Sequence, residues 1–301
     1  MYRVKMGRAK LWRKKLRSFG SHKISLILIV FFSFAFIFSA TMIVLHYVQL
    51  AQEDKALREL SVSVQSVEKS SALQELYERN RDMVGWIRID GTRIDYPVMH
   101  TGDDFYLSHS FDKKTSKSGV PYVDKRCTVY PFGTNTIIYG HNMRNGRMFA
   151  DLLKYEDKEF FTEHPFIQFD TLHEQQKYEI IAVFKSKIYR NSDKVFKHYN
   201  FLSVDNPAVF DEYIANIKAL ALYDTGVTAS YGDELLTLVT CSYHTENGQF
   251  VVVAKKHNTR SGGQRDQGDR LTDRARSPGL SPRAITIIPN GYLRRSTDNL
   301  Y

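Results

Sequence analysis

Cysteine is scarce in this chain of 301 residues, which contains only Cys127 and Cys241. No CxxC or HExxH spacing occurs, so the common ligand patterns of a zinc site are absent. One disulfide between the two cysteines is conceivable in an exported protein, and it would silence Cys241 as a nucleophile. Cys127, however, lies in a polar stretch flanked by proline and glycine (residues 125–133) that is typical of a loop, so we do not expect this bridge.

Acidic residues are missing from the first 23 positions, which carry nine lysines and arginines. Residues 257–301 carry +4, which leaves −4 for residues 24–256 out of a net charge of +9 for the whole chain. The basic character therefore belongs to the two ends. The mildly acidic middle argues against a nucleic-acid-binding protein.

Charged residues of either sign are absent from residues 24–48. A helix of roughly 20 residues crosses the core of a bilayer, so this run predicts one transmembrane anchor. The alternative is a cleaved signal peptide, whose apolar core is usually about 7–15 residues long and is followed by small residues. This run is longer, and Ser39 and Ala40 lie inside it. Basic residues before the run and acidic residues after it place the N-terminus (residues 1–23) in the cytoplasm and the following domain outside the cell membrane.

Two flanking segments bound the central domain, which we place at residues 75–256. Residues 49–74 are rich in helix formers and contain no glycine or proline, so we predict a helical stalk, although a plain solvated spacer is equally compatible with residues 49–68. Residues 257–301 are rich in glycine, serine, arginine and aspartate, and we predict that they are disordered. This tail could be a linker, a binding arm or read-through sequence.

Short runs of β-forming residues, separated by turns, fill most of the central domain. One clear helix is predicted at residues 205–222, where Asp205-Asn-Pro can cap the start and apolar residues recur every three or four positions. Shorter helices are predicted at residues 148–153 and 158–161. Many strands with few helices favour a mostly antiparallel β-barrel or sandwich. The runs are residues 85–90, 94–99, 119–124, 136–141, 165–170, 177–184, 234–241 and 250–255.

Two of these runs end in a reactive side chain, His141 in one and Cys241 in the other. If both strand ends lie at one edge of a sheet, a thiolate nucleophile can meet an imidazole that serves as acid and base. The simpler interpretation is a small buried cysteine and a histidine with a structural role. The neighbouring sequence decides between these interpretations.

Five strings, in this order and behind a membrane anchor, resemble class B sortases over residues 75–256. The resemblance implies a mostly β fold, a sortase-type mixed β-barrel with peripheral helices that is preceded by one transmembrane helix. The helix at residues 205–222 is similar to the extra helix that marks this class. The strings are VGWIRI (84–89), IDYPV (94–98), TIIYGHNM (136–143), MF (148–149) and TLVTC (237–241).

The resemblance implies a membrane-anchored cysteine transpeptidase of Gram-positive bacteria. Such an enzyme cleaves a C-terminal sorting signal, here an NPxTx-like peptide, after threonine through a cysteine thioester, and it passes the protein to a cell-wall amine. By position, Cys241 is the nucleophile and His141 the general acid and base, and no metal or organic cofactor is needed. The implied partners are surface proteins that carry a sorting signal, the amine of the peptidoglycan precursor, and the membrane.

One position departs from the family pattern, because Gln249 stands where the family has an arginine a few residues after the cysteine. Arginine offers a charged fork to an oxyanion, whereas glutamine donates from a neutral amide. Loss of one oxyanion donor typically costs about 10²–10³ in rate. The enzyme is then slow, or a backbone amide shares the task, or the chain is an impaired homologue that binds sorting-signal peptides without turnover. A generic anchored β-domain with a structural cysteine would explain the anchor but not the ordered strings.

Overall fold

The computed structural model describes residues 8–66 and 69–257. The α-helices are α1 (Arg8–Ser66), α2 (Lys69–Arg79), α3 (Lys158–Glu163) and α4 (Pro207–Leu220). The strands are β1 (Met83–Arg88), β2 (Asp95–Met99), β3 (Tyr122–Val123), β4 (Asn135–Tyr139), β5 (Phe166–Asp170), β6 (Gln175–Lys187), β7 (Leu235–Cys241) and β8 (Gly248–Lys256). Three short 3-10 helices are η1 (Phe105–Leu107), η2 (Ala150–Glu156) and η3 (His198–Asn200).

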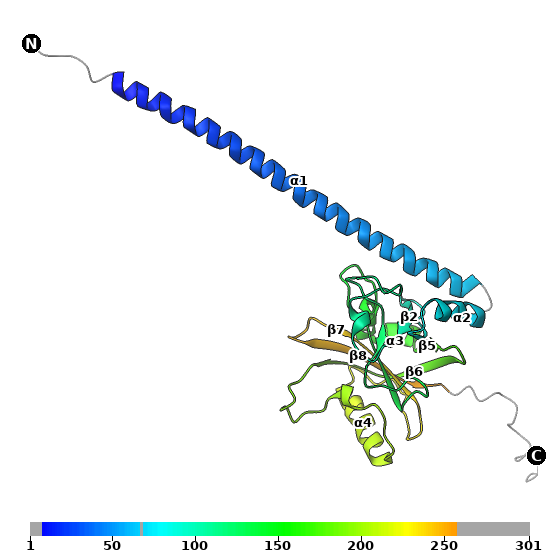
Figure 1. Cartoon of the computed structure of the whole chain (residues 1–301). Coiled ribbons are helices and arrows are strands. Elements are labelled where there is room, and N and C mark those ends of the chain that lie inside the picture. The colour runs from blue at the N-terminus through cyan, green and yellow to red at the C-terminus, as the bar shows by residue number, and fades with distance from the viewer. Residues whose placement is uncertain (1–7, 67–68, 258–301) are drawn as a thin grey trace, which may run out of the picture. The chain divides into compact units, whose positions relative to one another are not determined.

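The strands close into one barrel in the order β1-β2-β3-β4-β7-β8-β6-β5 (Figure 1). Most neighbours are antiparallel, while β2–β3 and β4–β7 are parallel. The predicted mixed barrel is therefore confirmed, and the sandwich is excluded. Each of the eight β-forming runs contains a strand. The first short helix predicted after residue 148 is a 3-10 helix that begins at Ala150.

The middle strands of the barrel are buried on both faces. In β7, every residue from Leu235 to Thr240 is buried, and β8 is buried from Gly248 to Ala254. Such strands read as continuous apolar runs because neither face meets water. They form the rigid floor from which Cys241 emerges.

Helix α4 covers part of this core with its apolar side, and both its ends have clear causes. Asn206 caps its start by accepting a hydrogen bond from the Ala208 amide at 2.9 Å, and Pro207 occupies the first turn. The helix ends at Leu220, two residues earlier than predicted, because the Leu222 amide instead bonds to the Val183 carbonyl of β6 at 2.8 Å. Phe210 and Ile217 are fully buried beneath it.

Helix α1 runs without a break from the basic N-terminal region through the apolar run into the predicted stalk. Its part between Ser25 and Val64 contains a stretch long and apolar enough to cross a membrane. Toward its end, Leu60 and Val64 are buried in a cluster that includes Trp86 of β1. The stalk is thus helical and packs on the barrel at its end, which a fully solvated spacer would not do. Of the predicted tail, residues 258–301 lie outside the described residues.

Candidate active site

The parallel pairing of β4 with β7 determines where His141 and Cys241 lie. Ile137 pairs with Thr237 and Tyr139 pairs with Val239, so the two chains advance in step. Two residues further on, His141 and Cys241 leave the barrel at the same edge. Parallel neighbours end on the same side of a sheet, and this register therefore brings together the two reactive residues that the sequence placed a hundred positions apart.

Two hydrogen bonds extend this pairing to the last residue before the reactive side chains. The Gly140 amide donates to the Val239 carbonyl at 3.1 Å, and the Thr240 hydroxyl donates to the Gly140 carbonyl at 2.8 Å. Glycine is required at position 140, because a Cβ atom there would lie 2.6 Å from the ring of Phe149. The approach of Phe149 thus explains the glycine that precedes the histidine.

The imidazole of His141 is held by a backbone carbonyl. Its Nε2 atom lies 2.8 Å from the carbonyl oxygen of Leu107, at the end of η1. A carbonyl oxygen only accepts hydrogen bonds, so Nε2 must carry a proton in this arrangement. In the neutral ring Nδ1 is then the basic nitrogen, and it is free to exchange a proton with another group.

The two cysteines have opposite surroundings. Both are free thiols, so the structure contains no Cys127–Cys241 bridge. Burial raises the pKa of the Cys127 thiol to about 11, and its sulfur lies 3.6 Å from the Asn135 carbonyl. Cys241 is exposed, and its backbone carbonyl accepts a hydrogen bond from the Asn142 side chain at 2.9 Å. Cys127 therefore matches a structural cysteine, while Cys241 is accessible to a reactant.

Gln249 lies next to Cys241, as the sequence position suggests. The two residues are direct partners across the antiparallel β7–β8 pair, so their side chains point to the same face. Gln249 is buried, with 8% of its surface exposed, and among the described residues its Oε1 atom has no hydrogen-bond partner. The amide is therefore not committed to a structural role at that oxygen.

These three residues line one groove, with a volume of about 850 Å³. Its walls combine tyrosines with charged side chains, which include Tyr122, Tyr139, Asp124 and Arg126. Burial, together with Asp104 and Asp124, raises the pKa of Tyr122 to about 12, so this phenol remains a neutral hydrogen-bond donor. Among the described residues no cluster of three metal-ligating side chains occurs.

Sequence reasoning missed a polar cluster on the groove wall. Arg126 donates two hydrogen bonds to the Asp124 carboxylate, at 2.9 and 2.7 Å, and one to the Tyr199 carbonyl at 2.7 Å. The Tyr139 hydroxyl also donates to Asp124, at 3.2 Å. Burial opposes ionisation of Asp124, but the bonds from Arg126 outweigh it and hold the pKa of this carboxyl below its usual value. No sequence pattern pointed to this cluster, because its members come from β4, a distant loop and the segment after β3.

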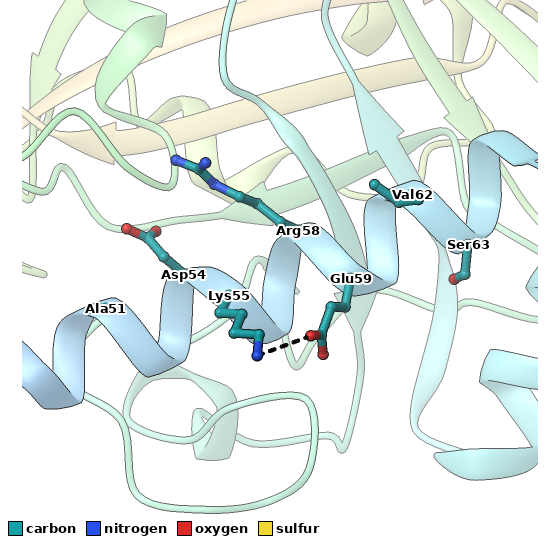
Figure 2. Close-up of a pocket in the computed structure, with 7 residues that line it drawn as sticks. All are labelled: Ala51, Asp54, Lys55, Arg58, Glu59, Val62 and Ser63. Carbon is teal, nitrogen blue, oxygen red and sulfur yellow. Dashed lines mark ion pairs between the residues drawn. The ribbon is translucent and has the colours of Figure 1, made fainter.

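A second hollow, shown in Figure 2, follows one side of α1 between Ala51 and Ser63. Its lining includes the pair formed by Lys55 and Glu59, at 3.8 Å, and contains no histidine or cysteine. It differs from the groove in having no nucleophile. The groove at Cys241 is therefore the candidate active site.

Comparison with known proteins identifies the family. The model of the sortase domain matches residues 87–257, which is more than half of the chain. The chain belongs to the sortase B family. Sortase B of Listeria monocytogenes is 36% identical to this sortase over 186 residues, which cover 61% of this chain and 73% of the relative. The chain is accordingly a sortase B-type cysteine transpeptidase.

Solved structures agree with this assignment. Sortase B of Clostridium perfringens superposes with a TM-score of 0.56 at 30% identity, covering 62% of this chain and 99% of that structure. Structures of Staphylococcus aureus sortase B, one a complex with substrate and one with triglycine, both give a TM-score of 0.62 at 24% identity. They cover 70% and 69% of this chain, respectively, and 99% of each matched structure. This last likeness supports the barrel fold of the sortase.

Proposed function

We propose that Cys241 is the nucleophile of this transpeptidase and that His141 is its general acid and base. The observation that carries the proposal is the parallel register of β4 and β7, by which both residues leave neighbouring strands at equivalent positions beside one groove. The exposed sulfur of Cys241 supports it further, because a nucleophile must be reached by its substrate. The buried Cys127 has no such access.

The proposed reaction has two steps. The Cys241 thiolate attacks the threonine carbonyl carbon of the sorting signal, and the carbon–nitrogen bond breaks as the His141 imidazolium gives its proton to the leaving amine. The resulting thioester is attacked by an acceptor amine, which passes a proton to His141 while the sulfur leaves as thiolate. A new amide bond forms, and the enzyme returns to its starting protonation.

We assign Gln249 to the oxyanion of the tetrahedral intermediates. Its position directly across from Cys241 puts its side chain about 5 Å from the sulfur-bearing side chain, within reach of an oxygen on the attacked carbon. The neutral amide supplies a weaker bond than an arginine would. This observation also favours the second candidate function, an impaired homologue that binds sorting-signal peptides without turnover.

The proposed substrates are surface proteins with an NPxTx-like sorting signal, and the proposed acceptor is an amine of the peptidoglycan precursor. The sortase B of S. aureus has been solved with triglycine, a peptide that begins with a primary amine. A similar glycine peptide is therefore a suitable test acceptor for this chain. The apolar part of α1 would anchor the enzyme in the cell membrane with the N-terminus in the cytoplasm and the groove outside.

Peptide turnover tests the proposal. Full-length protein in detergent is mixed with a fluorogenic NPxTx peptide, with and without triglycine. We expect cleavage after threonine and a ligated product with triglycine. Cys241→Ala should abolish both, and His141→Gln should reduce both strongly, whereas the matched control Cys127→Ala should retain them. Peptide binding that survives Cys241→Ala, without any turnover by the unaltered protein, would instead establish the impaired homologue.

A further inference from the structure

The loop that carries His141 also touches α1 where this helix leaves its apolar run. The guanidinium of Arg147 donates a hydrogen bond to the Leu50 carbonyl at 2.6 Å and forms an ion pair with Asp54. Arg147 is buried, with 7% of its surface exposed. We call these three residues the clamp. A buried, charge-assisted contact of this kind is stronger than an exposed surface pair.

Two further contacts place α1 against the barrel on both sides of the clamp. A hollow of about 410 Å³ is lined by Asp54 and Arg58 of α1 together with Arg93 and Asn145 of the barrel. Another, of about 240 Å³, lies between the Gln49–Leu60 part of α1 and the loop that contains Lys114. Figure 2 shows Asp54 and Arg58 projecting from the same side of the helix. The start of the stalk is therefore bracketed by two barrel loops.

The His141 loop is internally fixed, so a contact at its tip also constrains its base. At the base, the Phe149 amide donates to the His141 carbonyl at 2.9 Å, and Asn142 forms a β-bridge with Met148. Near the tip, Arg93 donates to the Asn145 carbonyl at 2.9 Å. The loop thus links the clamp to the proposed acid and base through a short, hydrogen-bonded path.

The position of Leu50 sets the height of this loop above a bilayer. The charge-free run ends at Val48, and two residues of helix add about 3 Å. The run of 25 residues is roughly 37 Å long as a helix, against about 30 Å for the hydrocarbon core. Its last residues therefore reach into the headgroup layer, and the clamp lies at that layer too.

We propose that the clamp docks the His141 loop onto α1 at the headgroup layer, so that the catalytic groove is held at the membrane surface. This inference rests on the proposed function for the membrane anchor and for His141. The partner of this surface is the lipid headgroup layer. Lys114 and Arg144, both exposed on the two bracketing loops, would face anionic headgroups. The clamp would favour substrates that are themselves held in the bilayer over free peptides.

Fluorescence quenching tests the clamp without relying on activity. Full-length protein with Cys241→Ala and Asn145→Cys is labelled at position 145 and reconstituted in vesicles that contain a headgroup-attached quencher. We expect strong quenching, reduced at least twofold by Arg147→Met and by Asp54→Ala. The matched control Arg144→Met alters an exposed arginine of the same loop and should keep the quenching within the experimental scatter.

A second readout compares one peptide in soluble form and on a lipid anchor. Asp54→Ala, which lies outside the groove, should lower kcat/KM for the anchored peptide by on the order of tenfold and leave the soluble peptide unchanged. Because Asp54 lies on α1, this variant also keeps the test valid if Arg147→Met does not fold. Weak quenching at position 145 in the parent protein, or quenching that both clamp variants preserve, would overturn the proposal. An enzyme that cleaves no peptide would instead count against the proposed function, since quenching decides the clamp independently.

Discussion

The role of Gln249 leads to a quantitative prediction for two substitutions at one position. Gln249→Leu keeps a side chain of similar size in the buried site but removes the amide donor. If this amide binds the oxyanion, kcat should fall by about 10²–10³, the usual cost of one oxyanion donor. Gln249→Arg supplies a charged donor, and a charge-assisted bond is roughly twice as strong as a neutral one of about 1 kcal/mol. The gain of about 1 kcal/mol corresponds to a roughly five- to tenfold higher kcat.

The assay is steady-state cleavage of the fluorogenic peptide by both variants and the unaltered protein. KM should change little, because the oxyanion exists only in the transition state and the intermediates. The Oε1 atom of Gln249, which has no partner among the described residues, makes the substitution by arginine compatible with the local hydrogen bonding. Unchanged kcat in Gln249→Leu would refute the reasoning and would transfer the oxyanion to a backbone amide.

Three further predictions concern reactivity and stability. Iodoacetamide should modify the exposed Cys241 in the folded protein and reach Cys127 only after denaturation, because burial raises the pKa of Cys127 to about 11; equal labelling rates would contradict this. Burial lowers the pKa of His198 to about 3, so the native state should lose stability as the pH falls below the unfolded value of about 6.5, by about 2 kcal/mol at pH 5. Urea unfolding at pH 7 and pH 5 should show this loss removed in His198→Leu but not in the exposed control His173→Leu. Leu60→Ala should lower the free energy of unfolding by about 2 kcal/mol, near the low end for a buried leucine, whereas the exposed control Val62→Ala should change it by less than about 0.5 kcal/mol; equal effects would show that α1 does not pack on the barrel.

The barrel could be predicted from sequence because its strands carry strong local signals. The runs before His141 and Cys241 are continuous and β-branched, as strands buried on both faces require. The helix α4 was equally visible, with proline after its cap and apolar residues in helical spacing. The exact end of α4 was not, since it depends on a hydrogen bond to β6, which lies far away in the chain.

The parts of the site that sequence could not supply are contacts between distant segments. Arg147 and Leu50 are 97 positions apart, and Arg126 and Tyr199 are 73 apart. Neither arginine stands in a pattern that distinguishes it from a solvated surface residue. The register of β4 against β7 also had to come from the structure, since the sequence indicated two strand ends without fixing which strands are neighbours.

The most direct test of the central claim is the mass of the protein after incubation with the NPxTx peptide and no acceptor amine. The account predicts an added acyl fragment that ends in threonine, mapped to Cys241, absent from Cys241→Ala and present in Cys127→Ala. No adduct in either the unaltered protein or Gln249→Arg, or an adduct on Cys127, would contradict the assignment of Cys241 as the nucleophile.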